Sequence, residues 1–321
     1  MDPRLSVVLL TWNEEANIQA CLAALAAQTD QRFEVLVLDA ASTDRTVAKV
    51  REAQEGFPVP LRLEVAERRI PIGEARNLGV RLAKAPCIAY VSADAELDPD
   101  WVRQALVSLE EADMVFGRQL HAPRTWTAAA AVRGLRYHFT EARDIDPLRF
   151  ASNVAAAYKR EVLEMFPFDP WANAAEDVLL ARRADAAGYV AVYNPDMLVR
   201  HHDVSTAAQE WRKNVREGEG CGLYASELGL MPTVLAWGGA LAVCFAATFL
   251  WTAQALLLGL ALLWAPAIRR ALQRRRQMPF WHLARGVAAS PPYDLAFLVH
   301  YLRGLNRARR LRSRKPKEVP A

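Results

Sequence analysis

Short apolar runs alternate with longer stretches of mixed polarity through the first two hundred residues of the chain. Runs such as LSVVLL, FEVLVLDA and CIAYVSA are apolar almost throughout and rich in β-branched residues, which is typical of buried strands. Stretches such as EEANIQACLAALAAQ repeat apolar residues every three or four positions, which predicts helices that pack on the strands. The alternation predicts an α/β fold with a mostly parallel sheet flanked by helices.

The pattern predicts five strands and four helices before residue 121. The strands are expected at 5–10, 33–39, 61–67, 87–93 and 113–120. The helices are expected at 14–28, 42–54, 71–85 and 98–112, the first of them capped near Asn13.

Polar clusters follow three of the expected strands, at Thr11–Glu14, Asp39–Asp44 and Asp94–Glu96. In parallel α/β sheets, ligands bind beyond the carboxyl ends of the strands. We therefore expect these three clusters to converge on one edge of the sheet. Each acid also has a simpler interpretation as a cap of the following helix, which suits Asp44 better than Asp39.

Five segments, weak singly, form a specific series together. They are VVLLTWNEEANI, VLVLDAASTDRT, GEARNLGV, YVSADAEL and AAEDVLLARRADAAGY. In this order and spacing they resemble the motifs of family-2 glycosyltransferases with the GT-A fold. The resemblance covers about residues 5–220 and implies a nucleotide-sugar donor.

The resemblance implies a set of donor-binding residues: Thr11, Asn13, Glu14, Asp39, Arg76 and Asp94. It implies that Asp39 contacts the nucleotide base and that Glu14 lies near the ribose. Arg76 offers a forked cation suited to phosphates. The family usually has a second acid and a glycine after Asp39, where this chain has Ala40 and Ala41.

The resemblance also implies a metal site and a catalytic base. The segment Ser92–Asp94 stands at the DxD-type signature, with Asp94 at its last acid and Ser92 in place of its first. Asp94 and His201 are the expected ligands of Mg²⁺ or Mn²⁺. We expect the small Ala93 and Ala95 to let metal and diphosphate approach, and Glu96 to lie just outside the site.

The ED motif supplies the expected base. An inverting transfer needs a carboxylate that accepts the proton of the acceptor hydroxyl, and the resemblance implies Asp177 for this role with Glu176 as its neighbour. The alternative is that both are first-turn acids favoured by the helix dipole.

Charge and hydropathy change after residue 231. Residues 1–231 hold 26 Lys and Arg against 34 Asp and Glu, a formal charge of −8, whereas residues 232–321 hold 14 against 2, a charge of +12. The segment Val234–Ile268 has no charged residue and is followed by RRALQRRRQ. We predict a catalytic domain at 1–231, a membrane-embedded helical hairpin at 232–268 and a basic amphipathic tail at 269–321 on anionic lipids.

These features together predict an inverting glycosyltransferase at the cytoplasmic side of a cell inner membrane. Its expected partners are a nucleotide-sugar donor, membrane lipids and a lipid-linked glycan precursor or polyprenyl phosphate as acceptor, as in cell-envelope polysaccharide synthesis; nucleic acid is not expected. One alternative is a catalytically weakened scaffold subunit, motivated by Ser92, Ala40 and Ala41. A nucleotidyltransferase ranks last, because LTWNEEANI has no glycine for a phosphate loop.

Overall fold

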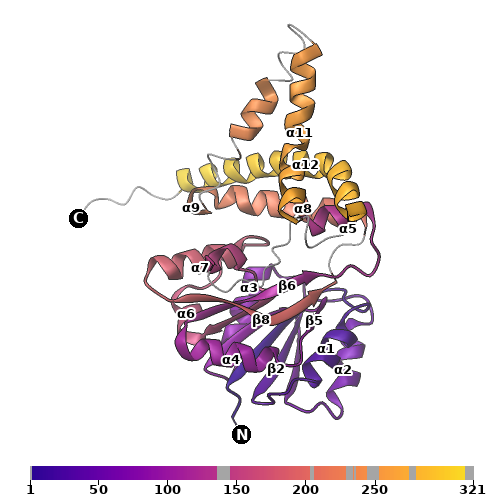
Figure 1. Ribbon diagram of the computed structural model, residues 1–321. Coiled ribbons are helices and arrows are strands. Elements are labelled where there is room, and N and C mark those ends of the chain that lie inside the picture. The colour runs from indigo at the N-terminus through magenta and orange to yellow at the C-terminus, as the bar shows by residue number, and fades with distance from the viewer. Residues whose placement is uncertain are drawn as a thin grey trace, which may run out of the picture. The chain divides into compact units, whose positions relative to one another are not determined.

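A computed structural model describes residues 2–135, 145–202, 206–228, 234, 236–243, 253–274 and 280–314 (Figure 1). The chain forms two compact units. The sheet unit comprises Met1–Arg124 and Tyr137–Asp203, and the helical unit comprises Thr125–Arg136 and Val204–Ala321. Each unit is described by itself.

The sheet unit alternates strands and helices as the hydropathy pattern predicts. Its strands are β1 (Leu5–Thr11), β2 (Phe33–Asp39), β3 (Leu61–Val65), β4 (Cys87–Ser92), β5 (Ala95–Leu97), β6 (Met114–His121), β7 (Ala155–Lys159) and β8 (Ala191–His201). Its helices are α1 (Ile18–Ala26), α2 (Thr46–Gln54), α3 (Ile72–Leu82), α4 (Trp101–Glu111), α6 (Arg160–Met165) and α7 (Glu176–Ala186), with a 3₁₀ turn at Pro147–Phe150.

The eight strands form one sheet in the order β3-β2-β1-β4-β7-β6-β8-β5. Strands β1 to β4 are parallel, but β7 lies between β4 and β6 and runs antiparallel to both. The sheet is therefore mixed, with β7 and β5 running against their neighbours. Strands β6 and β8 pair in parallel and run in the direction of β1 to β4, so most of the sheet is parallel, as expected. Local hydropathy cannot reveal the direction of β7, because direction depends on how distant segments connect.

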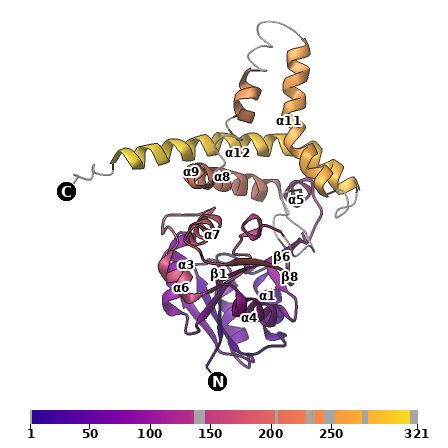
Figure 2. The same ribbon diagram turned by 60° about the vertical axis from the view of Figure 1, so that its left-hand side comes forward.

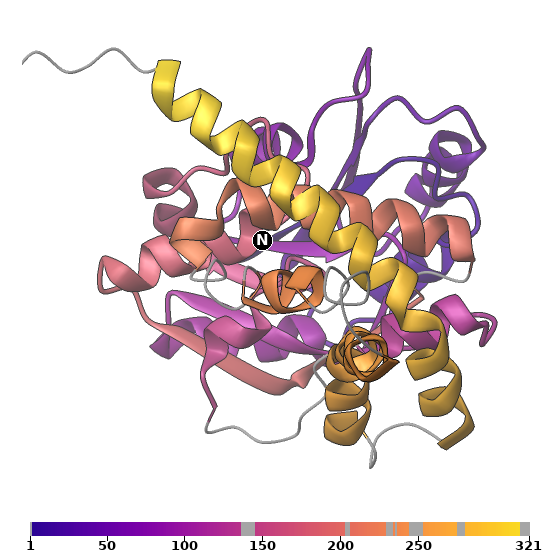
Figure 3. The same ribbon diagram turned by 90° about the horizontal axis from the view of Figure 1, so that it is seen from above.

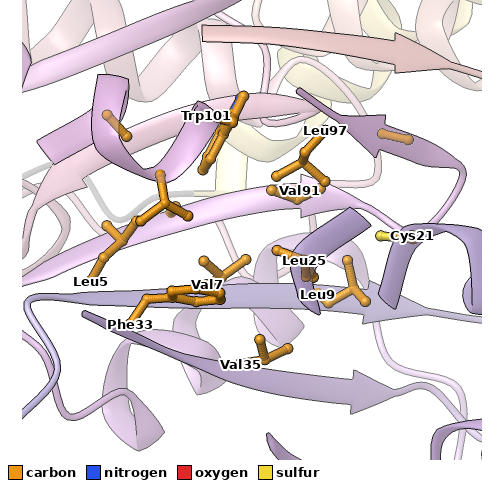
Figure 4. Packing of buried hydrophobic residues seen from close by; sticks show 14 of the residues in the cluster. Leu5, Val7, Leu9, Cys21, Leu25, Phe33, Val35, Val91, Leu97 and Trp101 are labelled. Atoms are coloured by element: carbon orange, nitrogen blue, oxygen red, sulfur yellow. The ribbon is translucent and has the colours of Figure 1, made fainter. Parts of the chain in front are cut away.

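Both faces of the sheet are covered. Along β1, Leu5, Val7 and Leu9 face the cluster built with α1, α2 and α4, while Val8 faces the cluster built with α3, α6 and α7. Figure 2 shows α1 and α4 on one side of the strands and α3 and α6 on the other. Figure 4 shows part of the first cluster, which includes the fully buried Trp101. Burial on both faces explains why these strands are apolar throughout.

The first helix begins later than predicted. It starts at Ile18 with Asn17 as N-cap, so Asn13 is not its cap. Asn13 instead has a left-handed backbone, with φ of 56°, and lies in the loop between β1 and α1. This loop is described with the site below.

The described helices of the helical unit include α5 (Ala128–Gly134), α8 (Ala207–Leu223), α9 (Ala225–Leu228), α11 (Ala253–Arg274) and α12 (Phe280–Arg314), and residues 236–243 are helical as well. Helices α8 and α12 lie side by side, as Figures 1 and 3 both show. Glycines allow the close approach: a Cβ at Gly222 would lie 2.0 Å from the carbonyl oxygen of Tyr301, and one at Gly304 would lie 2.2 Å from that of Glu219.

A buried charged cluster joins α5 to α8. The Arg133 guanidinium donates to Glu210 Oε2 and Glu217 Oε1, each at 2.9 Å. Asn214 Nδ2 donates to Glu210 Oε1 at 2.6 Å. Glu210 and Asn214 are fully buried, so their charges and dipoles depend on these partners.

The predicted hairpin at 232–268 lies partly outside the described residues, which lack 244–252. Within the described ranges, no helix combines the length and apolar character needed to cross a membrane.

Candidate active site

The carboxyl ends of three strands bring the predicted polar clusters to one edge. In the sheet register Thr11 stands beside Asp39, and Leu10 stands beside Ser92. The antiparallel β7 begins at the same edge, because Ala155 pairs with Val91. The segments after β1, β2 and β4 and the segment before β7 therefore meet there.

Asp39 organises the loops at this edge. Its carboxylate accepts hydrogen bonds from Thr11 Oγ1 at 2.9 Å, from the backbone N–H of Ser42 at 2.7 Å and from Ser42 Oγ at 2.6 Å. Ser42 Oγ in turn accepts from the backbone N–H of Asn13 at 2.8 Å. Asp44 lies just before α2, and its carboxylate accepts from the Thr46 N–H at 2.9 Å. The partners of Asp39 lie ahead of Arg45, the N-cap of α2, so the capping interpretation fits Asp44 and not Asp39.

Strained backbone concentrates at the same edge. Among the described residues, the non-glycine residues with positive φ are Asn13 at 56°, Ala41 at 60° and Ala175 at 65°. Ala41 occupies the position where the resemblance expects glycine, and its left-handed backbone gives the physical reason for that glycine. Such strain costs of order 1–3 kcal/mol per residue and clusters at functional sites.

Asp94 and His201 are in direct contact. His201 Nε2 lies 2.9 Å from Asp94 Oδ1, and Ser92 Oγ donates to the same oxygen. The contact follows from strand pairing, since β5 lies antiparallel to β8 with Ala95 opposite His201. The expectation for Ala93 and Ala95 was wrong: both are buried in the core cluster under the sheet edge, so their small size serves packing there.

A second acid–histidine pair lies next to the first. His202 Nε2 lies 2.6 Å from Glu96 Oε1, and His202 Nδ1 lies 2.6 Å from the carbonyl oxygen of Ala122. The backbone N–H of His202 donates to the Asp94 carbonyl at 2.7 Å. Glu96 therefore anchors β8 beside the site.

Glu14 shares the electrostatic environment of Asp94. Burial, followed by the negative charge of Asp94, raises the pKa of Glu14 to about 7. Its Oε2 accepts from Asn17 Nδ2 at 2.9 Å, and its backbone N–H donates to Thr46 Oγ1 at 2.8 Å. Acidic groups are thus close together on this side of the edge, and Glu14 is partly protonated at neutral pH.

The Asp94–His201 pair fits a divalent cation. A carboxylate oxygen and an imidazole nitrogen are both ligands of Mn²⁺. Their separation of 2.9 Å is close to the roughly 3 Å between neighbouring ligands of a six-coordinate ion bound at about 2.1 Å. Among the residues described, no cluster of three or more His, Cys, Asp or Glu side chains is arranged around an ion. Asp94 and His201 are the two ligands predicted here, and phosphate oxygens commonly complete such a coordination shell.

The ED motif begins α7 and is tied to α3. Arg76 Nη1 donates to Glu176 Oε1, and both side chains are largely buried. The guanidinium also lies over the rings of Tyr90 and Phe168, at 5.6 and 5.4 Å from their centroids. Removing either partner of a buried guanidinium–carboxylate pair leaves the other charge buried and unpaired, which is strongly destabilising. The GEARN and ED motifs are therefore structurally linked. Binding of donor by Arg76 stays a prediction.

Asp177 lies at the same sheet edge. Its Oδ2 accepts from the backbone N–H of Asn153, just before β7, at 3.1 Å. Burial, and then the charge of Glu176, raises the pKa of Asp177 to about 6, although Arg76 and backbone donors act in the opposite direction. A carboxylate with a pKa near 6 is a competent general base at neutral pH.

The loop before α7 is held by α3. A Cβ at Gly73 would lie 1.9 Å from the carbonyl oxygen of Asp169, so only glycine fits there. Asn77 Nδ2 donates to the Phe168 carbonyl at 2.7 Å, and the Phe168 N–H donates to Asn77 Oδ1 at 3.0 Å. The position of Asp177 therefore depends on α3.

The structure brings the predicted residues into two neighbouring groups at one edge. Thr11, Asn13 and Asp39 join through Ser42, and Asp94 joins His201. Arg76, Glu176 and Asp177 form the second group. Sequence reasoning missed Asn153 and the role of Ser42. Ser42 follows the DAAS turn, which is a local signal, whereas nothing in the sequence near Asn153 indicates its contact with Asp177.

The mixed sheet with helices on both faces and acidic side chains at the strand ends is the architecture of a GT-A-type fold, and comparisons with known proteins give the family. Glycosyl transferase family 2 matches residues 6–166, half of the chain. The chain belongs to this family and is a glycosyltransferase. The resemblance inferred from the five motifs is confirmed.

Named relatives are distant. Glycosyltransferase AglE of Haloferax volcanii is 27% identical over 228 residues, 68% of this chain and 73% of AglE. The O-antigen chain rhamnosyltransferase RfbN of Salmonella typhimurium is 26% identical over 223 residues, 65% of this chain and 70% of RfbN.

Solved structures share the fold. The mannosyltransferase PcManGT of Pyrobaculum calidifontis, in complex with GDP-Man and Mn²⁺, superimposes with a TM-score of 0.56 at 22% identity, covering 98% of this chain and 89% of that one. TarS 1-349 of S. aureus in complex with UDP gives 0.56 at 15% identity, covering 100% and 94%. At these identities the likeness concerns the fold alone.

Proposed function

We propose that this protein transfers a sugar from a nucleoside-diphosphate sugar to an acceptor hydroxyl with inversion. The observation that carries the proposal is the position of Asp177, a partly desolvated carboxylate at the sheet edge that also holds the Asp94–His201 pair. In an inverting transfer a base accepts the proton of the acceptor hydroxyl, and positive charge, such as that of a metal ion, stabilises the leaving diphosphate.

The loops at the ends of β1 and β2 bind the nucleoside in this proposal. The Asp39 network holds Thr11 and Asn13 in place, so the rim of the site is formed before the donor arrives. Asp94 and His201 would hold Mg²⁺ or Mn²⁺, which neutralises the diphosphate as it leaves. PcManGT and TarS were solved with GDP-Man and UDP, respectively, which supports a nucleotide-sugar donor.

Asp177 performs the proton transfer. The acceptor oxygen forms a bond to the anomeric carbon while the bond from that carbon to the diphosphate oxygen breaks. Asp177 accepts the proton of the attacking hydroxyl, and the nucleoside diphosphate leaves on the opposite face. Glu176, neutralised by Arg76, holds the start of α7 in place.

We propose a lipid-linked glycan precursor or polyprenyl phosphate as acceptor, at the cytoplasmic face of a membrane. Supporting this is the helical unit, whose α12 exposes Leu295, Val299 and Leu302 at helical spacing and, at its start, Phe280 and Trp281. The formal charge of +12 in residues 232–321 adds attraction to anionic lipids.

The first test is a thermal-shift and transfer assay. Purified protein is incubated with UDP-glucose, UDP-GlcNAc and GDP-mannose, each with Mn²⁺ or with EDTA. We expect one donor to raise the melting temperature with metal and to be consumed, and EDTA to abolish consumption. Asp177→Asn is expected to bind this donor unchanged and to lose at least about a hundredfold in rate.

Two results would contradict the proposal. Full activity of Asp177→Asn would remove the base. Absence of any donor binding, with the protein folded, would favour the scaffold subunit suggested by Ser92, Ala40 and Ala41.

A further inference from the structure

Asn153 lies beside the proposed base and is 3% exposed. Its backbone N–H donates to Asp177 Oδ2 at 3.1 Å. Because Ala155, two residues on, pairs with Val91 at the end of β4, Asn153 lies at the same sheet edge as Ser92 and Asp94. The side chain of Asn153 is thus at the proposed reaction centre.

Tyr158 holds the Asn153 side chain in place. The Tyr158 hydroxyl donates to Asn153 Oδ1 at 2.7 Å. Tyr158 is fully buried and packs edge-on against Tyr90 and Phe116, with ring centroids 6.2 and 6.0 Å away. The packed Tyr158 ring fixes the hydroxyl, and the hydroxyl fixes the orientation of the Asn153 amide. The amide nitrogen is therefore a donor with a fixed position.

That donor has no acceptor. Asn153 Nδ2 is a buried atom without a hydrogen-bond partner within the described parts of the chain, and so are Glu176 Oε2 and Arg76 Nε in the adjoining ion pair. An unmet buried polar group costs about 1–3 kcal/mol, so such atoms are few in native proteins. Three of them around one carboxylate indicate a site that a ligand completes.

We propose that Asn153 binds a sugar hydroxyl during transfer, donating a hydrogen bond to it through Nδ2. This inference rests on the proposed function and names a residue that recognises its substrate. A hydroxyl is both acceptor and donor, so it matches the amide of Asn153 and the free oxygen of Glu176. Arg76 balances the charge of Glu176, so the carboxylate of Asp177 is the charge that disfavours a phosphate at this point, whereas a neutral hydroxyl is accepted.

The hydroxyl belongs either to the transferred sugar or to the acceptor, and two assays separate these sources. The first measures the Kd of the donor that stabilises the wild-type protein and the Kd of its nucleoside diphosphate alone. The second measures the KM of octyl glucoside and octyl mannoside as acceptors. Each is run on wild type, Asn153→Ala and Asn194→Ala.

Asn194→Ala is the matched control. Asn194 is also buried, at 8% exposure, and lies in the first half of β8, away from His201 at the end of that strand. Its amide nitrogen donates to Gln104 at 3.2 Å and to Ser108 at 2.9 Å, both on α4. The Asn194→Ala variant should have a lower melting temperature but an unchanged donor Kd and an unchanged acceptor KM. Tyr158→Phe, which frees the amide, serves as a second test if Asn153→Ala fails to fold.

We expect Asn153→Ala to raise one of the two constants about tenfold, a loss near 1.4 kcal/mol, and to leave nucleoside-diphosphate binding unchanged. A rise in donor Kd assigns the hydroxyl to the transferred sugar, and a rise in acceptor KM assigns it to the acceptor. If both constants stay within twofold while wild type binds donor, only water fills the site and the inference is wrong. If wild type binds no donor, the proposed function fails and the inference fails with it.

Discussion

At the scale of the residue, the surroundings of Asp177 disfavour the ionised form of its carboxyl group. Burial and the charge of Glu176 raise the pKa of Asp177 to about 6, while Arg76, which forms an ion pair with Glu176, limits the rise. In the unfolded chain the carboxyl returns to its ordinary value of 3.8, so folding favours the protonated form. Keeping Asp177 ionised at neutral pH therefore costs stability, and its proposed role as the base gives a reason for that cost.

This argument predicts the pH dependence of both activity and stability. The rate constant kcat/KM should rise with pH through about 6 and then level, because only ionised Asp177 accepts a proton. As the pH rises from about 4 to 6 the protein should lose stability, because over this range the folded state binds more protons than the unfolded state. Asp177→Asn should remove the acid limb of activity and the Asp177 part of the stability change, leaving the part due to Glu14, and should melt no lower than wild type at pH 7.5. An acid limb that persists in this variant would assign it to another group.

At the scale of the element, close contacts between backbones decide where the helices lie. In the sheet unit, Gly73 lets α3 meet the loop that ends in Ala175 and the ED motif. In the helical unit, Gly218, Gly222 and Gly304 let α8 and α12 approach each other. Glycine here is required by space, since φ is not left-handed at these positions.

We predict that Gly222→Ala destabilises the protein. The added methyl group would lie 2.0 Å from the Tyr301 carbonyl oxygen, and relieving such overlap typically costs about 1–3 kcal/mol. Gly239→Ala is the control, because nothing lies within 4 Å of its Cβ position, and it should be neutral or stabilise by up to about 1 kcal/mol through helix propensity. Chemical denaturation of both variants measures the difference. Equal stability would show that α8 and α12 do not pack closely in solution.

At the scale of the whole molecule, the chain divides its charge between its two ends. The catalytic motifs lie in a part with a formal charge of −8, and the basic residues lie in a part with +12. In α12 the exposed Arg303 and Arg309 accompany exposed apolar side chains such as Trp281, at 73% exposure. Such a surface attracts anionic lipid first by charge and then by insertion of apolar groups.

We predict that the full chain binds vesicles containing phosphatidylglycerol and does not bind neutral phosphatidylcholine vesicles. Binding should weaken several-fold in 0.5 M NaCl, because salt screens exposed charges. The double variant Phe280→Ser, Trp281→Ser should weaken it further, whereas Trp171→Ser, at an equally exposed tryptophan of the sheet unit, should not. Equal binding to both kinds of vesicle, or to none, would contradict the proposed membrane surface.

The sequence by itself determined the local elements, the family and the residue types of the site. Apolar runs and strand-end acids are local patterns, and parallel strands ending at a common edge make their convergence predictable. It did not reveal the antiparallel β7, the start of α1 or the burial of Ala93 and Ala95.

Only the tertiary structure decided which side chains meet. Arg76 pairs with Glu176, one hundred positions away, and Asn153 contacts Asp177 because β7 enters the sheet next to β4. The physical reason is that burial and long-range pairing set the partners and the pKa of a charged group, and neither is encoded in a window of neighbouring residues.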